Sequence, residues 1–247
     1  MHYAIIGCIH GNRDALVATL EDIRQRGIER VVCLGDVVGF GPDPIECLQL
    51  VRDRCFICIR GDHDEALLTG SEGFIPKTTR VLDWTRERVQ ETDATLLAFL
   101  DQALSSFESA GISFVHGSPK SPHEHLFPSD VRRNRRKLRA AFAMTEKVCF
   151  NAHTHVPGVI SEEPLAWYSA KELDGYYHYR KGVKALINVG SVGQPRDGDP
   201  RACYLEIKKN EIYWRRVEYD LGGVLDRLQA HQDVFAPDLA IRLAKGR

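Results

Sequence analysis

The sequence predicts an α/β fold with a second group of strands, and three observations lead to that prediction. Short apolar runs typical of buried strands alternate with longer amphipathic stretches typical of helices. Strands follow one another directly in the second half of the chain, which indicates a second sheet. The 247 residues are 43% hydrophobic and 27% charged, the composition of an ordinary protein with a buried core. We therefore expect one domain over residues 1–247, and neither a disordered nor a fibrous chain.

Each predicted element rests on a local pattern. Residues 3–7 are apolar and predict a buried strand, whereas 13–26 predict an amphipathic helix because Leu16, Leu20 and Ile23 share one face. The same reasoning predicts further strands at 30–34, 55–59, 112–115, 148–151, 184–189, 201–207 and 211–219. It predicts further helices at 44–52, 78–89, 94–104 and 131–142, and two short helices from Leu221 onward.

Charge and hydropathy exclude several classes of protein. Lys and Arg number 33 against 34 Asp and Glu, so the formal charge of -1 attracts neither nucleic acid nor an anionic membrane. No apolar run approaches the ~18 residues of a spanning helix, and no basic leader precedes the first strand. Glycine-rich nucleotide fingerprints are absent, which leaves redox-cofactor and kinase chemistry without support. We expect a cytoplasmic protein without a membrane partner.

The cysteines predict core residues rather than a disulfide scaffold. They number seven, an odd count, and lie in apolar segments spread along the chain. Cys55 and Cys58 have CxxC spacing, but on a predicted strand their sulfurs should face opposite sides of the sheet. We expect these two to be core residues as well.

Polar, metal-capable residues follow the predicted strands at five places. They are Cys8-Ile9-His10-Gly11-Asn12, Gly35-Asp36, Gly61-Asp62-His63-Asp64, His116-Gly117 and His153-Thr154-His155. Groups just past the carboxyl ends of strands converge on one crevice in open α/β sheets. Imidazoles and carboxylates are ligands of Zn, Fe or Mn, and this set is too large for one tetrahedral ion. The pattern therefore predicts two metal ions, ~3.5 to 4 Å apart, in an arrangement suited to in-line attack at phosphorus.

In this order, these motifs resemble the calcineurin-like metallophosphoesterase superfamily. Three further segments resemble its small bacterial phosphodiesterase-like branch, namely Gly39-Phe40-Gly41-Pro42-Asp43-Pro44, His116-Gly117-Ser118-Pro119 and residues 188–201. The resemblance covers effectively the whole chain. It implies a four-layer αββα sandwich, in which two mixed sheets are flanked by helices.

The resemblance also implies a role for each site residue. One metal ion would be held by Cys8, His10, Asp36 and His155, and the other by Asp36, Asp62, His116 and His153. Asp36 would bridge the two ions, because only a carboxylate in this set can offer one oxygen to each. His63 would be the general acid that protonates the leaving alkoxide after attack of a metal-bridging hydroxide, since histidine titrates near neutrality. Asn12 and Arg196 are expected to bind the substrate phosphate.

Two residues of the expected metal shell depart from the family pattern. Position 8 is Cys where the family has Asp, and position 62 is Asp where the family has Asn; milder departures are Ala152 for Gly and Val189 for Pro. A thiolate at Cys8 would favour Zn or Fe, with Mn as the other possibility, because soft thiolate prefers those metals. The other interpretation is that Cys8 packs like a small hydrophobe beside a weak or empty first site.

Two other segments carry weaker signals. Residues 131–142 contain six basic side chains, which are typical of a solvated helix face but could steer an anionic substrate. His123 and His125 lie in a predicted loop that could cover the site and shape substrate choice.

The sequence thus predicts a dinuclear metal-dependent phosphoesterase acting on a small phosphoester or nucleotide, with a diester preferred. Asp36 is followed by Val37-Val38-Gly39, whereas protein phosphatases of the same superfamily typically have Asp-Arg-Gly there. Two alternatives stay open: a phosphomonoesterase, and a catalytically weakened metal-binding regulatory protein. Cys8 and Asp62 are the residues that support the second alternative.

Overall fold

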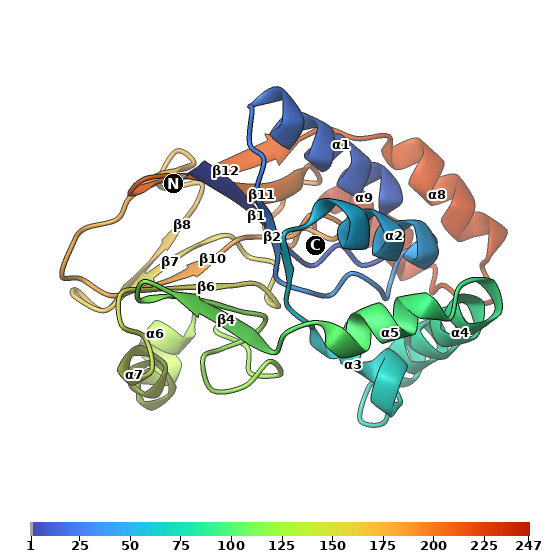
Figure 1. Cartoon of the computed structure of the whole chain (residues 1–247), viewed down its shortest axis with the longest axis horizontal. Coiled ribbons are helices and arrows are strands. Elements are labelled where there is room, and N and C mark those ends of the chain that lie inside the picture. The colour runs from blue at the N-terminus through green and yellow to red at the C-terminus, as the bar shows by residue number, and fades with distance from the viewer. Residues whose placement is uncertain (1) are drawn as a thin grey trace.

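Two six-stranded mixed sheets face each other in the computed structural model, which describes residues 2–247, and helices cover both outer faces (Figure 1). The first sheet has the order β3 (Ile57–Cys58), β2 (Val31–Cys33), β1 (His2–Ile6), β11 (Ala202–Lys208), β12 (Glu211–Val217), β9 (Tyr176–His178). The second has the order β4 (Ser106–Ser109), β5 (Ile112–Val115), β6 (Val148–Asn151), β10 (Ala185–Asn188), β7 (Gly158–Ser161), β8 (Ala166–Ser169). The predicted four-layer sandwich is confirmed.

The helices are distributed unequally over the two sheets. Helices α1 (Arg13–Gln25) and α2 (Pro44–Arg54) lie over the first sheet, and α6 (Asp130–Arg133) and α7 (Arg135–Ala143) lie under the second (Figure 1). The remaining helices are α3 (Asp62–Thr69), α4 (Pro76–Thr92), α5 (Thr95–Gln102), α8 (Leu221–Ala230) and α9 (Asp238–Lys245). None of the helices formed by residues 2–247 is long and apolar enough to cross a membrane.

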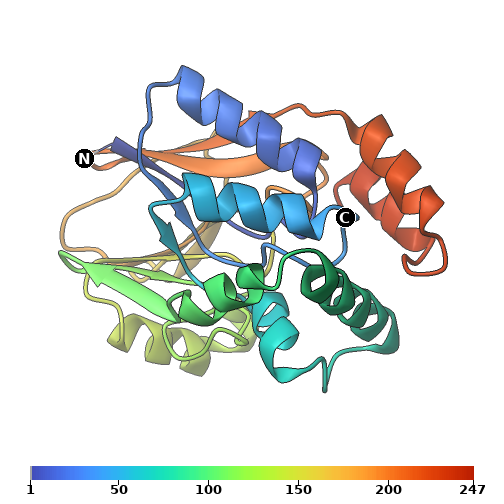
Figure 2. The same cartoon turned by 45° about the vertical axis from the view of Figure 1, so that its right-hand side comes forward.

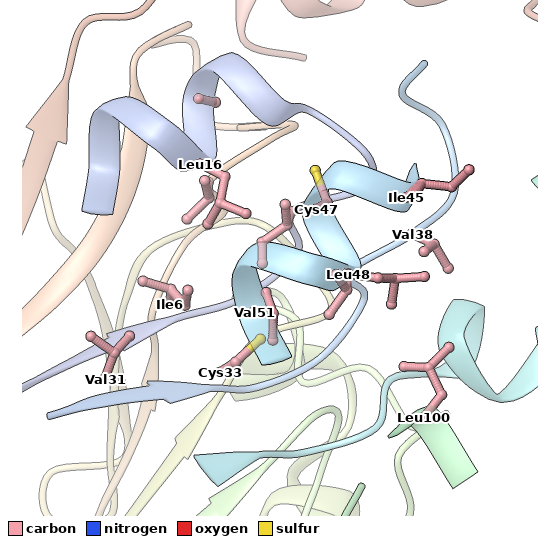
Figure 3. Packing of buried hydrophobic residues seen from close by; sticks show 14 of the residues in the cluster. Ile6, Leu16, Val31, Cys33, Val38, Ile45, Cys47, Leu48, Val51 and Leu100 are labelled. Atoms are coloured by element: carbon pink, nitrogen blue, oxygen red, sulfur yellow. The ribbon is translucent and has the colours of Figure 1, made fainter. Parts of the chain in front are cut away.

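Alternation along the central strands builds the core on both sides of each sheet. In β1, Tyr3 and Ile5 pack between the sheets, whereas Ala4 and Ile6 pack under the helices, as the two-residue period of a strand requires. Figure 3 shows the helix side of this sheet, where Leu16 of α1 and Leu48 of α2 pack over Ile6. Each buried isoleucine or leucine of this kind stabilises the fold by about 1.5–3 kcal/mol.

Three departures from the predicted elements have local causes. The predicted helix 131–142 is two helices, because Asn134 leaves the helical region with φ of -145° and caps α7 by accepting a hydrogen bond from Lys137 N. The strands β4, β7, β8 and β9 are only three or four residues long and were not predicted. Helix α3 was also missed, because its first turn consists of the polar residues Asp62, His63, Asp64 and Glu65.

The cysteines are all free thiols, as predicted, but the placement predicted for the CxxC pair is wrong. Cys55 follows the end of α2 instead of lying in a strand, and it packs with Cys58 against the same core cluster, which includes Cys33. The two side chains therefore share one side of the sheet. Their role as core residues is unaffected.

Candidate metal centre

The five strand-end clusters meet at one edge of the sandwich. Cys8 and His10 follow β1, Asp36 follows β2, Asp62 begins α3 after β3, His116 follows β5, and His153 and His155 follow β6. All seven side chains are buried, with at most 7% of any residue exposed. They form two groups that share Asp36, and within each group the potential ligand atoms lie within 4.8 Å of one another. The structure therefore brings together all seven residues for which the sequence predicts metal binding.

Five of these seven residues have left-handed backbone conformations. The φ angles are 50° for Cys8, 52° for His10 and Asp36, 60° for His153 and 62° for His155. Residues with a Cβ seldom adopt this conformation, and when they do they cluster at functional sites. Backbone hydrogen bonds hold the turns, among them His10 N to Asp36 O at 2.8 Å. The strained backbone aims side chains from separate loops at one point.

The first group consists of Cys8, His10, Asp36 and His155. The Nε2 atoms of His10 and His155 lie 3.0 Å apart. Each ring has its Nδ1 at a carbonyl, at 3.1 Å from Val38 O for His10 and 2.6 Å from Gln194 O for His155, so each Nδ1–H donates there. Both Nε2 lone pairs therefore face inward, which is the orientation that outer hydrogen bonds give to metal-binding histidines.

Protonation in the first group favours cation binding by the two histidines. Burial lowers the pKa of His10 to about 3 and that of His155 well below its ordinary value, so both rings are neutral at pH 7. Burial and the nearby Asp36 carboxylate raise the pKa of the Cys8 thiol well above its ordinary value. Cys8 Sγ also accepts a hydrogen bond from His153 N at 3.2 Å and packs within the core between the sheets. The thiol would have to lose its proton to become a ligand.

The second group consists of Asp36, Asp62, His116 and His153. His116 Nε2 lies 3.3 Å from Asp36 Oδ2 and 3.1 Å from Asp62 Oδ1, and His153 Nδ1 lies 3.1 Å from the same Asp62 oxygen. His116 Nδ1 donates to Leu34 O at 2.7 Å. Burial alone would lower the pKa of His116, but the two carboxylates outweigh it and raise this pKa well above its ordinary value.

The closely spaced ligand atoms of the second group fit a cation. Asp62 Oδ1 lies 3.1 Å from both His116 Nε2 and His153 Nδ1, and no backbone N–H or hydroxyl donates to it. A buried carboxylate oxygen without such donors is costly, and a cation among these atoms would relieve that cost. Imidazole nitrogen and carboxylate oxygen donors suit Zn, Fe or Mn.

Asp36 connects the two groups through a single oxygen. Oδ2 faces both His10, at 3.5 Å, and His116, at 3.3 Å, while Oδ1 accepts a hydrogen bond from His63 N at 3.0 Å. Asp36 is thus the residue at which the two groups meet, where the sequence predicts the bridging carboxylate. Burial and Asp62 raise the pKa of Asp36, but His116 and His63 outweigh them and bring it down to about 2.

His63 lies beside the centre without joining either group. Its ring is T-shaped against His10 at 4.9 Å and packs on Phe40 at 4.7 Å and Phe74 at 5.3 Å between centroids. Gly39 has a φ of 88°, and a Cβ there would lie 2.1 Å from His63 Nδ1, so only glycine leaves room for the ring. Burial lowers the pKa of His63, and the Asp36 and Asp62 carboxylates oppose that shift.

Asp64 is a positioning residue whose role the sequence did not indicate. Its fully buried carboxylate accepts from Val37 N at 2.8 Å, Val38 N at 3.3 Å and Gly61 N at 3.0 Å. It thereby ties the loop after β2 to the start of α3, the two segments that carry Asp36 and Asp62. Burial, followed by the Asp36 charge, raises the pKa of Asp64 to about 7. The available signal was an acidic residue at the third position of a helix, but that helix was not predicted.

The two expected phosphate-binding residues differ in their surroundings. Asn12 caps α1, since its Oδ1 accepts from Ala15 N at 3.1 Å and its Nδ2 donates to Gly193 O at 3.0 Å. The cap occupies Oδ1, and Gly193 O takes one of the two Nδ2 hydrogens, so only one N–H of Asn12 is left for a substrate. Arg196 donates from Nη2 to Gln194 Oε1 at 2.8 Å, and its Nε is buried without a partner. Arg196 is thus the better placed of the two to bind an anion.

The loop that contains His123 and His125 lies over the second group. The His125 ring is 3.6 Å from the His153 ring between centroids, and Phe127 stacks on His125 at 4.9 Å. His123 Nε2 lies 3.3 Å from Glu65 Oε2 on α3, which connects the loop to the helix that begins at Asp62. The basic side chains of α6 and α7 are mostly exposed, as expected for a solvated face.

Comparison with known proteins agrees with this geometry. The sequence model of the calcineurin-like phosphoesterase superfamily domain matches residues 1–210. The chain is 34% identical to protein MJ0912 of Methanocaldococcus jannaschii over 233 residues. The aligned region covers 91% of this chain and 90% of that protein. The crystal structure of a metallophosphoesterase from Sphaerobacter thermophilus is similar with a TM-score of 0.84 and 31% identity over 100% of this chain and 99% of that one. Protein PH1004 of Pyrococcus horikoshii OT3 has the same fold, with a TM-score of 0.73 and 19% identity over 100% of this chain and 98% of that one. The chain therefore belongs to the calcineurin-like phosphoesterase superfamily.

Proposed function

We propose that this protein is a dinuclear metal-dependent phosphoesterase that hydrolyses a phosphodiester. The observation that carries the proposal is the pair of buried ligand groups joined by one oxygen of Asp36. A single cation could be bound by only one of the two histidine pairs, His10–His155 or His116–His153. Membership of a phosphoesterase superfamily supports the same conclusion.

Each ligand group would hold one ion. Cys8, His10, Asp36 and His155 would hold the first, and Asp36, Asp62, His116 and His153 would hold the second. When bound, two such cations supply a hydroxide nucleophile at neutral pH and neutralise charge on the phosphoryl oxygens during in-line displacement. The buried carbonyls of Val38, Leu34 and Gln194 keep three of the imidazoles correctly oriented for this task.

We assign His63 as the proton donor to the leaving group. It is a buried histidine beside both groups and belongs to neither, so its imidazole is not committed to an ion. Its backbone N–H is anchored on Asp36 Oδ1 at 3.0 Å, which fixes the ring relative to the centre. The aromatic rings of Phe40 and Phe74 exclude water from its surface. Arg196 would bind a phosphoryl oxygen through its planar guanidinium.

Experiments can distinguish the diesterase from a monoesterase and from a regulatory protein with one metal ion. The preference for a diester over a monoester rests on Val37-Val38-Gly39 after Asp36, where an Asp-Arg-Gly sequence is typical of protein phosphatases in this superfamily. A regulatory protein with one metal ion is supported by Cys8, whose neutral buried thiol also fits a packing role. In that case the first group would bind its ion weakly or not at all.

Metal analysis combined with two ester assays tests the proposal. The purified protein should contain close to two transition-metal ions per chain and should hydrolyse a chromogenic diester faster than the matching monoester. A chelator should abolish both activities, and restored metal should return them. His116→Ala should lower the metal content, whereas His178→Ala, an exposed histidine on β9, should not. Activity that survives chelation would refute the mechanism, and one ion per chain without turnover would support the regulatory protein.

A further inference from the structure

Two half-buried arginines near the centre have no carboxylate partner. Arg196 and Arg242 form no ion pair with an aspartate or glutamate among residues 2–247. Arg196 donates to Gln194 Oε1, and Arg242 donates to Arg247 O. By contrast, Arg216 and Arg227 of the same half of the chain both pair with aspartates. Asp36 and Asp62 are within electrostatic range of Arg196, and Asp238 is within that range of Arg242, but none of them forms an ion pair with either guanidinium. Guanidinium groups that are not held in an ion pair keep N–H donors for an anion from outside.

Arg242 lies one aromatic ring away from the proposed proton donor. Its guanidinium stands over the Phe40 ring at 5.9 Å from the centroid. The Phe40 ring also contacts His63, at 4.7 Å, and His10, at 4.9 Å. A group bound to Arg242 would therefore lie beside the ring that packs on His63.

Helix α9 holds Arg242 in a defined place, because both of its ends are attached to the rest of the protein. At its start, Lys77 of α4 pairs with Asp238 at 2.9 Å. At its end, Gly246 O accepts from Gly198 N at 2.9 Å, and a Cβ on Gly246 would lie 2.7 Å from the Asp199 backbone. Figure 2 shows α8 and α9 together at one side of the molecule, beyond the ends of α1 and α2. The family match ends at residue 210, so Arg242 belongs to a part of the chain outside it.

Arg196 and Arg242 place positive charge at two different parts of the site. Burial and then the charge of Arg242 lower the pKa of Arg196, so the two guanidinium groups are within electrostatic range of each other. Arg196 N donates to the carbonyl of His155 at 3.3 Å, which places Arg196 on the metal-centre side. Arg242 is separated from the ligand His10 by the Phe40 ring. Arg196 is thus suited to the scissile phosphate, and Arg242 to a charge farther along the substrate.

We propose that the substrate has a second anionic group on its leaving alcohol, and that Arg242 is the specificity-determining residue that binds it. This inference rests on the proposed function, because it is His63 that marks the leaving-group side. A guanidinium can bind either a carboxylate or a phosphate in a bidentate manner. The substrate class is therefore a phosphodiester whose leaving group carries a carboxylate or a phosphate.

Methyl aryl phosphate diesters that differ only in the para substituent test this directly. The three substituents are carboxylate, carboxamide and phosphonomethyl; carboxamide is the neutral counterpart of carboxylate. Arg242→Ala should lower kcat/KM for the charged esters about three- to tenfold through KM, with little change for the carboxamide. The larger of the two losses identifies carboxylate or phosphate as the preferred group. Arg242→Lys should recover part of the loss.

Lys245→Ala is the matched control, because it removes an exposed positive charge from the last turn of the same helix. It should leave all three esters unaffected. A loss shared equally by the charged and neutral esters, or an equal loss in Lys245→Ala, would overturn the proposal. A melting curve of each variant shows whether the fold is retained.

A binding measurement separates this inference from the proposed function. Calorimetry with 4-carboxybenzylphosphonate and 4-carbamoylbenzylphosphonate, in which CH2 replaces the ester oxygen, needs no turnover. Tighter binding of the carboxylate that is lost in Arg242→Ala would support the inference even if no ester were hydrolysed. Equal binding of both compounds by the unmodified protein would overturn it, even if the esterase activity were present.

Discussion

His116 Nε2 lies 3.1 Å from Asp62 Oδ1, a contact that requires a proton when no cation is present. The Asp36 and Asp62 carboxylates raise the pKa of His116 well above its ordinary value, although burial acts in the opposite direction. A metal ion at this position must replace that proton, because only the neutral imidazole has a lone pair to offer. Metal affinity of the second group is therefore coupled to pH.

The first prediction is that binding of an ion at the second group releases about one proton per chain at pH 7. Since the pKa of His116 is raised, the proton is present at neutral pH, and affinity for the ion should rise with pH until that pKa is reached. Calorimetric titration of metal-free protein in buffers of different ionisation enthalpy counts the protons. The Asp62→Asn variant lacks one of the two carboxylates that raise the pKa of His116, so the proton release at pH 7 should decrease. An unchanged release in that variant would contradict the assigned protonation.

The second prediction concerns His63. His63→Ala should leave the metal content unchanged, because His63 is outside both ligand groups. Turnover of esters with poor leaving groups should fall by roughly two to four orders of magnitude, the usual contribution of a general acid. The loss should be smaller for a nitrophenyl ester, since nitrophenolate leaves without protonation. His178→Ala serves as control, and loss of a metal ion from His63→Ala would show that His63 is a ligand instead.

The third prediction is that Asp64 supports both stability and metal binding without being a ligand. Asp64→Ala would leave the buried N–H groups of Val37 and Gly61 unpaired, which should lower the free energy of unfolding by about 2 kcal/mol or more. Asp64→Asn keeps one acceptor oxygen but presents an NH2 group toward one of these donors, so its loss should be smaller. Denaturant unfolding measures both effects. The Asp64→Ala variant should also bind metal more weakly, because the loops of Asp36 and Asp62 lose their common anchor.

Much of the fold and the location of the site could be predicted because strand ends determine both. Residues 148–151 form β6 as predicted, and His153 and His155 then follow at a fixed place beyond the sheet. Local patterns could not reveal β7, β8 and β9, because strands of three or four residues are stabilised by their neighbours in the sheet more than by their own sequence.

The details of the site depend on contacts between residues far apart in the chain. His116 donates to Leu34 O, which is 82 positions away, and no spacing rule predicts this contact. The same is true of Asp64, whose acceptor role appears only when the loop after β2 is in place. Arg242 was missed for this reason as well, because only the docking of α9 brings it over Phe40.

The last prediction decides whether Cys8 is a ligand or a packing residue. Burial keeps its thiol protonated in the metal-free protein, so coordination through sulfur must release a further proton and should favour Zn or Fe. Cys8→Asp should shift the metal preference toward Mn, and Cys8→Ser should weaken the first site because it keeps the size but removes the soft anion. Cys203→Ser, at a fully buried thiol outside both groups, controls for loss of core packing. If Cys8→Ser binds the same metals in the same amounts and is equally active, the sulfur packs in the core and the first ion is held by His10, Asp36 and His155 alone.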